Sequence, residues 1–75
     1  MKKVTISLNT VDKVKSFVNT ISKFDATAEL QSEPYTVDAK SIMGIFSLDL
    51  AKPVTLVLHE SEDRIAEAVK PYAVA

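Results

Sequence analysis

The hydrophobic periodicity changes near the start of the chain, and this change restricts the possible fold more than any other feature. Between Lys2 and Leu8, apolar residues alternate with polar ones, which is typical of a strand with one buried face. Beyond the cap residues Asn9 and Thr10, the spacing becomes three or four, which predicts an amphipathic helix of about 14 residues. The residues with this spacing are Val11, Val14, Phe17, Val18, Ile21 and Phe24. A half-buried strand followed by such a helix predicts helices packed on one face of a sheet.

The remaining segments extend this pattern. Further strands are predicted over 26–31, 35–39 and 54–58. Ser41 begins a short apolar segment whose length suits a two-turn helix, and Ser61 caps a last helix. On that helix one face carries Ile65, Ala68, Val69 and Tyr72. The predicted order is β-α-β-β-α-β-α, an α+β open-faced sandwich with a four-stranded antiparallel sheet covered on one face by three helices.

The composition excludes several classes of function. With 75 residues we expect one domain over 1–75. The chain has 9 basic and 10 acidic residues, so it lacks the basic excess of a nucleic-acid-binding domain, and we exclude that class of protein. The absence of cysteine and the single histidine exclude disulfides and His- or Cys-based metal sites, so we expect no metal and no cofactor. No apolar run reaches the roughly 20 residues needed to cross a bilayer, and we expect no secretory signal, because the charged start Met1-Lys2-Lys3-Val4 is too short and polar for one. We therefore expect a cytoplasmic protein that is not an enzyme.

Residues 38–48, with the sequence DAKSIMGIFSL, resemble the regulatory-serine region of HPr, the small phosphocarrier of the bacterial sugar phosphotransferase system. The run from Lys40 to Gly44 is the most specific part of the likeness. The element order supports it over nearly the whole chain, as do the segments Val4-Thr5-Ile6 and Phe17-Val18. The resemblance implies a single HPr-like domain with the open-faced β-sandwich fold.

The resemblance also implies a regulatory site at Ser41. In Gram-positive members of the family, the serine at this position is phosphorylated by an ATP-dependent HPr kinase. The apolar residues after it form a docking surface in the family. The matching residues here are Ile42, Met43 and Phe46, and we predict that Lys40 takes part in partner binding beside them. A phosphate on Ser41 would meet unpaired N–H groups at a helix start, and Lys40 beside it could screen the added charge.

The family's phosphate-accepting histidine has no counterpart here. HPr proteins carry it in a Gly-Leu-His-x-Arg-Pro pattern at the start of the first helix. Counted back from Phe17-Val18, Thr10 occupies the histidine position, Asp12 the arginine position and Lys13 the proline position. Thr10 has no imidazole, and Asp12 would repel a phosphate. We therefore expect no phosphocarrier function, a pattern similar to that of the catabolite-repression HPr-like proteins.

Each of these residues also has a plain structural interpretation. Ser41 suits a helix N-cap, the apolar residues after it can be scattered surface residues, and Thr10 with Asp12 can be an ordinary cap and a first-turn acid. His59 follows a strand, where a lone histidine is usually a boundary residue. Two alternative functions remain open: a phosphocarrier with a displaced acceptor such as His59, and a degenerate structural module.

The resemblance implies two protein partners, the HPr kinase and a catabolite-control repressor of the LacI type. Asp12 stands where the family's arginine makes polar contacts with the repressor, which argues against the second. The sequence leaves open whether the domain is a monomer or a strand-exchanged dimer.

Overall fold

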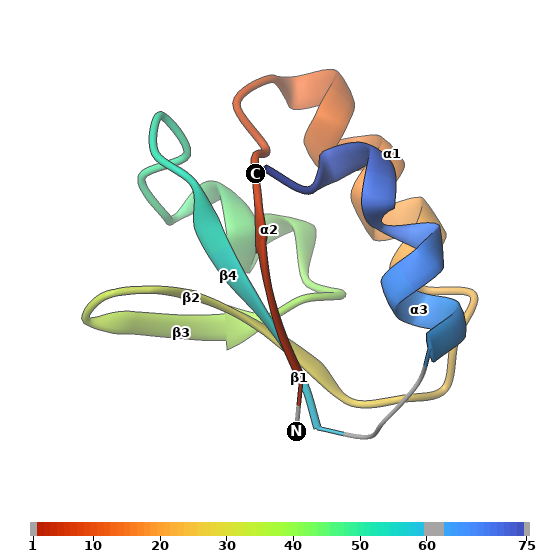
Figure 1. Cartoon of the computed structure of the whole chain (residues 1–75). Coiled ribbons are helices and arrows are strands. Elements are labelled where there is room, and N and C mark those ends of the chain that lie inside the picture. The colour runs from red at the N-terminus through yellow and green to blue at the C-terminus, as the bar shows by residue number, and fades with distance from the viewer. Residues whose placement is uncertain (1, 60–62, 75) are drawn as a thin grey trace.

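The computed structural model describes residues 2–59 and 63–74, and its strands form one antiparallel sheet (Figure 1). The strands are β1 (Lys2–Ile6), β2 (Ala28–Ser32), β3 (Tyr35–Asp38) and β4 (Val54–Leu58). Their spatial order is β1-β4-β2-β3, and every neighbouring pair is antiparallel. The two central strands, β4 and β2, are therefore neighbours in the sheet although they are not consecutive in the sequence.

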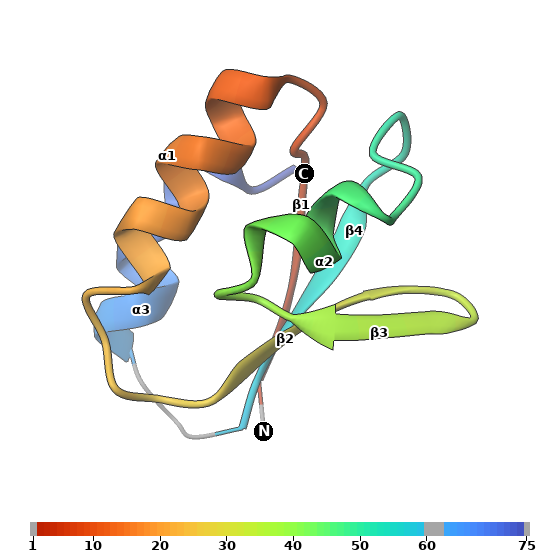
Figure 2. The same ribbon diagram turned by 180° about the vertical axis from the view of Figure 1, so that it is seen from behind.

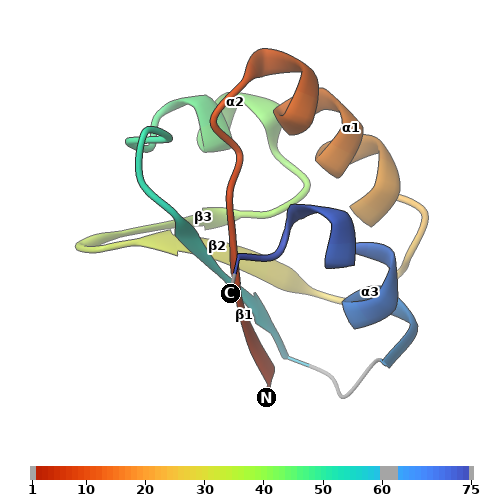
Figure 3. The ribbon, with the colours of Figure 1, turned by 45° about the horizontal axis from the view of Figure 1, so that its top comes forward.

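The helices lie together on one side of this sheet (Figure 3). They are α1 (Val11–Ile21), α2 (Ile42–Phe46) and α3 (Asp63–Ala68), followed by a 3-10 turn, η1 (Lys70–Tyr72). None of the helices in the described ranges is long and apolar enough to cross a membrane. The open-faced α+β architecture predicted from the sequence, with four strands and three helices, is confirmed.

The core lies between the helices and the covered face of the sheet. Helix α1 contributes Val14, Phe17 and Ile21, all at most 1% exposed. Alternate strand residues meet them, among them Ile6, Leu30 and Leu56. Val57 is also buried, but it is not in this cluster, because it alternates with Leu56 and Leu58 along β4 and faces the open side.

Several element boundaries differ from the sequence prediction: β2 and β3 are shifted or shortened by one or two residues, and β1, α1 and the last helix are shorter. Strand β1 ends at Ile6 because the Ser7 N–H donates to the carbonyl of Tyr72, 2.8 Å away, and not to β4. Helix α1 ends at Ile21, and the chain then turns so that the Phe24 N–H donates to the Ile21 carbonyl at 3.2 Å. The last helix is shorter than predicted and continues as a 3-10 turn that contains Pro71, which has no N–H for an α-helical bond. Its predicted cap, Ser61, lies outside the described residues.

The C-terminal residues cover the outer edge of β1, as Figure 1 shows near the C label. Ala73 forms a bridge with Ile6, and the Val74 N–H donates to the Thr5 carbonyl at 3.0 Å. The Tyr72 ring meets Phe17 edge-on, with the ring centroids 5.7 Å apart. Backbone groups of β1 that would face solvent are thereby paired, which reduces the exposed edge of the sheet.

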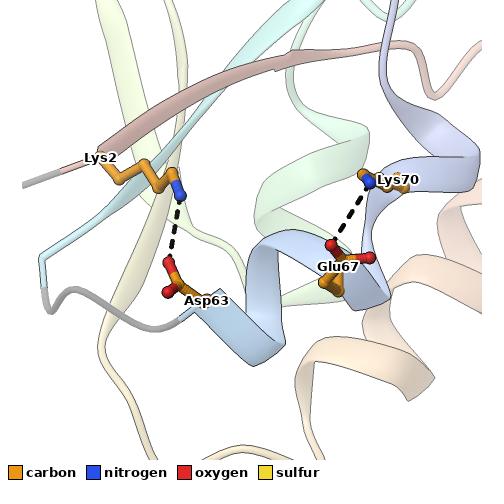
Figure 4. A network of polar contacts seen from close by, with 4 residues as sticks. All are labelled: Lys2, Asp63, Glu67 and Lys70. Carbon is orange, nitrogen blue, oxygen red and sulfur yellow. Dashed lines mark hydrogen bonds and ion pairs between the residues drawn. The ribbon is translucent and has the colours of Figure 1, made fainter.

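Surface ion pairs add little to this packing. Lys2 of β1 reaches Asp63 at the start of α3 at 3.4 Å, and Lys70 reaches Glu67 at 3.3 Å (Figure 4). All four side chains are largely exposed, and exposed pairs of this kind contribute about 0–1 kcal/mol each. The fold is therefore stabilised mainly by its apolar core.

Candidate functional site

Ser41 is the N-cap of α2, and its hydroxyl is fixed by the helix it begins. Its backbone is extended, and the Oγ atom accepts a hydrogen bond from the Gly44 N–H at 3.1 Å. Gly44 permits this close approach, since a Cβ atom there would lie 3.2 Å from the Ser41 Oγ and 3.2 Å from the Val37 Cβ. The cap interpretation of Ser41 is thus confirmed, and the serine remains only partly buried.

Helix α2 lies between α1 and β3 (Figure 2). Its apolar residues divide between a buried and an exposed face. Ile45 is fully buried, and Ile42, one turn earlier on the same face, is half-buried against the core. Met43 and Phe46, also one turn apart, are 78% and 43% exposed. We call Met43 and Phe46 the apolar patch. Ile42, predicted with them, packs mainly inward because it shares the face of Ile45.

Lys40 is directed away from the cap. The side-chain ammonium of Lys40 donates to the carbonyl of Phe24 in the turn after α1. The backbone N–H of Lys40 donates to the Asp38 carboxylate at 2.9 Å. The Ser41 N–H donates to the Asp38 carbonyl at 3.0 Å, so the loop before α2 is closely held. The role of Lys40 in partner binding stays a prediction. In this structure its charge is used inside the chain.

Thr10 begins α1 in the same way that Ser41 begins α2. Its Oγ1 atom accepts from the Lys13 N–H at 3.1 Å, and the Lys13 ammonium donates to Asn9 Oδ1 at 3.1 Å. Asp12 lies in the first turn and is exposed. The interpretation of Thr10 as a cap and of Asp12 as a first-turn acid is confirmed.

His59 lies at the other end of the sheet. It follows β4, and the register pairs Leu58 with Lys2 at one end and Val54 with Ile6 at the other. Since α1 begins just after Ile6, His59 and Thr10 are separated by the length of the strands. The His59 Nε2 atom lies 2.7 Å from Glu29 Oε1, and both side chains are 37% exposed.

The pairing of His59 with Glu29 is a contact that sequence reasoning missed. Glu29 pairs with Val57 between β2 and β4, which places its side chain on the same open face as His59 two residues further on. The strand order was needed to find it, because no local pattern shows that β2 and β4 are neighbours. Within residues 2–59 and 63–74, no group of three or more potential metal ligands occurs.

Comparisons with known proteins agree with this fold and with its elements. Residues 11–72 match the family described as the PTS HPr component phosphorylation site. The match begins directly after Thr10.

Solved structures support the same assignment. HPr-C-His from Thermoanaerobacter tengcongensis superimposes with a TM-score of 0.78 and 32% identity, over 92% of this chain and 86% of that one. The phosphocarrier protein HPr from Bacillus anthracis gives a TM-score of 0.73 and 31% identity, over 97% of this chain and 94% of that one. The histidine-containing phosphocarrier protein of Mycoplasma shares the fold, with a TM-score of 0.73 but 16% identity over 93% and 86% of the two chains.

The HPr resemblance that the sequence suggested around Ser41 is therefore confirmed over most of the chain. Helices α1 and α2 both lie within the matched residues, as does the cap residue Ser41, and the cap residue Thr10 directly precedes them. With 32% and 31% identity over 92% and 97% of its length, and a family match over residues 11–72, the chain belongs to the HPr family of the phosphotransferase system.

Proposed function

We propose that this chain is a cytoplasmic regulatory protein of the HPr family, which is phosphorylated on Ser41 and binds a protein partner through the apolar patch. One observation carries the proposal: a helix-capping serine hydroxyl lies within two turns of two exposed apolar side chains, Met43 and Phe46. A modification at the hydroxyl would change the charge beside a hydrophobic surface. Such a surface can then be switched without any change in the fold.

The surroundings of Ser41 suit an added phosphate. The first turn of α2 contains no acidic residue, and the N–H of Gly44 already faces the Oγ atom. In the reaction, Oγ forms a bond to the γ-phosphorus of ATP, ADP leaves, and the hydroxyl proton passes to a base of the kinase. The phosphate oxygens could then accept from the same backbone N–H group that Oγ uses now.

The start of α1 does not suit phosphate transfer. Phosphohistidine chemistry needs an imidazole and a cation to hold the dianion, whereas α1 begins with the Thr10 hydroxyl and the Asp12 carboxylate. The only histidine of the sequence, His59, lies at the opposite end of the sheet and is bonded to Glu29. We therefore infer that the carrier step of the family is lost in this chain.

The partners follow from the same surface. An HPr kinase would have to recognise Ser41 together with the apolar patch, and Met43 suits such a surface because its flexible thioether adapts to different partners. A LacI-type repressor is the second candidate. The exposed Asp12 on the neighbouring helix opposes it, because the family's contact there uses a cation.

Intact-mass measurement after incubation with ATP, Mg²⁺ and an HPr kinase tests the phosphorylation. We expect one added phosphate on the unmodified chain and none on Ser41→Ala. The Bacillus anthracis HPr serves as the positive control in the same tube. If that control is labelled and this chain is not, Ser41 is a helix cap only, and the chain is a degenerate structural module.

The docking surface is tested by calorimetry with the same kinase. We expect Met43→Ala and Phe46→Ala each to weaken binding about tenfold, as truncation of a buried interface residue often does. Tyr35→Ala is the matched control, because Tyr35 is also an exposed aromatic residue, at 65%, but lies on β3. Equal losses for Tyr35 and Phe46 would contradict the assignment of the patch.

A further inference from the structure

Phe24 connects three segments that are far apart in the sequence. It lies in the turn after α1, and its carbonyl accepts a hydrogen bond from the ammonium of Lys40, which precedes Ser41. The guanidinium of Arg64, at the start of α3, lies over the Phe24 ring, 5.5 Å from its centroid. The Phe24 side chain itself packs against the core. One residue thus joins the turn after α1, the loop before α2 and helix α3.

The hydrogen bond from Lys40 has a clear electrostatic reason. Helix α1 has no basic residue in its last turn, although the C-terminal end of a helix favours a positive charge. Phe24 follows that end by three residues, and Lys40 supplies the charge from another segment. The bond is partly buried, and none of the ion pairs found in the described ranges involves Lys40. Its acceptor is a neutral carbonyl.

A phosphate on the next residue would be a stronger acceptor for this ammonium. The bond to the Phe24 carbonyl is already charge-assisted through the ammonium, but a phosphate carries nearly two negative charges and would add direct attraction between opposite charges. The lysine side chain is a flexible four-carbon stem, which can turn to a neighbouring residue. The Phe24 carbonyl and a phosphate on Ser41 would therefore compete for one cation.

We propose that Lys40 is a switch residue, which holds the turn after α1 while Ser41 is unmodified and moves to the phosphate when Ser41 is phosphorylated. This inference rests on the proposed function of Ser41. Release of the Phe24 carbonyl loosens the turn and weakens the contact between Phe24 and Arg64. Phosphorylation is then transmitted from the loop before α2 to the start of α3, and a partner can detect it there without touching Ser41.

The competition defines Lys40 as a positioning residue rather than a partner contact. Its effect on Ser41 is indirect, since its ammonium is used inside the chain in the unmodified state. Loss of the ammonium should reproduce at Phe24 what the phosphate does. This equivalence separates the switch from a general effect of added negative charge.

The test uses the full 75-residue chain made by chemical synthesis, with serine or phosphoserine at position 41. Amide hydrogen exchange of Phe24 and Lys23 reports the turn, and the ring-current shift of the Arg64 side-chain protons reports the contact with Phe24. We expect phosphoserine to speed exchange of the Phe24 amide about tenfold, the change produced by losing one charge-assisted hydrogen bond at the lower end of its range. The Arg64 shift should decrease in parallel.

Lys40→Met provides the decisive comparison. In the unphosphorylated chain it should speed the same amide by a similar factor, and phosphoserine should then add nothing further at Phe24. Lys40→Arg should restore the unmodified behaviour, and Lys15→Met, which removes an exposed lysine of α1, should change nothing at Phe24.

Unchanged exchange at Phe24 and an unchanged Arg64 shift in the phosphoserine chain would overturn the switch. Additive effects of phosphoserine and Lys40→Met would overturn it too. Because the phosphate is installed by synthesis, these outcomes do not depend on a kinase. Failure of the switch is therefore distinguishable from failure of Ser41 to be a kinase substrate.

Discussion

The starts of α1 and α2 share one capping arrangement but differ in what surrounds it. In each, a side-chain oxygen accepts from the backbone N–H three residues later at 3.1 Å: Thr10 Oγ1 accepts from Lys13, and Ser41 Oγ accepts from Gly44. Helix α1 then has 11 residues, of which three are buried, and an acid in its first turn. Helix α2 has five residues, one of them buried, and no acid in its first turn.

This difference separates a structural helix from a helix that presents a surface. Helix α1 is held by Phe17 and its buried neighbours, so its start is fixed by the core. Helix α2 is held by Ile45 and leaves Met43 and Phe46 outside. The capping hydrogen bond is the same in both. In the proposed function, the distinction between the two helices comes from the charge in the first turn and from the face left exposed.

The largest expected effect comes from giving α1 the chemistry it lacks. The double variant Thr10→His/Asp12→Arg should take up acid-labile phosphate from phosphoenolpyruvate through enzyme I, whereas the unmodified chain should take up none. The histidine supplies the nucleophilic nitrogen and the arginine replaces a repelling carboxylate. Intact mass before and after mild acid treatment measures the outcome.

Two controls sharpen this result. The single variant Thr10→His should be labelled at least about tenfold more slowly than the double variant, because the Asp12 carboxylate still repels the phosphate dianion. A factor of ten in rate corresponds to about 1.4 kcal/mol in the barrier. Adding His59→Gln to the double variant should leave the labelling unchanged. Acid-labile phosphate on the unmodified chain would show that His59 or another group serves as a displaced acceptor.

The two helix starts were also unequal in what the sequence could predict. The caps at Thr10 and Ser41 followed from residue type and position, which are local properties. The docking residues after Ser41 were implied by the family resemblance, and the structure leaves two of them, Met43 and Phe46, exposed. The direction of Lys40 did not follow from local properties, because its acceptor is a carbonyl 16 positions earlier in the chain. Such a contact depends on how the turn after α1 meets the loop before α2.

The same limit explains the other differences. The shortened β1 follows from a carbonyl of Tyr72, 65 positions away from Ser7 in the numbering, and the His59–Glu29 contact follows from the strand order. Periodicity identifies which face of a strand is buried, but it does not identify the neighbouring strand. The fold class was therefore predictable from the sequence, whereas the contacts between distant segments required the structure.

A smaller effect tests the division between core and surface. Phe17→Ala should lower the free energy of unfolding by about 3–5 kcal/mol, since it removes a fully buried ring, whereas Met43→Ala should change it by less than about 0.5 kcal/mol. Urea denaturation followed by circular dichroism measures both. Phe17→Leu, which keeps most of the volume, is the control for α1. A large loss for Met43→Ala would mean that Met43 is part of the core and is not free for docking.

The smallest expected effect concerns the caps themselves. Thr10→Ala and Ser41→Ala should each lower the free energy of unfolding by about 1 kcal/mol, because each leaves one N–H of the first turn without its side-chain acceptor. Urea denaturation with an unchanged m-value measures these losses, and Thr10→Ser and Ser41→Thr should recover most of them. Equal losses would show that the two hydroxyls have the same structural role. The two capping hydrogen bonds, which have the same length, would then also have the same energy. Any difference in phosphorylation between the two hydroxyls would therefore be caused by Asp12 and by the apolar patch. A loss at Ser41 far above that at Thr10 would instead mean that the serine is retained to hold α2 against β3, and the case for a regulatory hydroxyl would lose its main support.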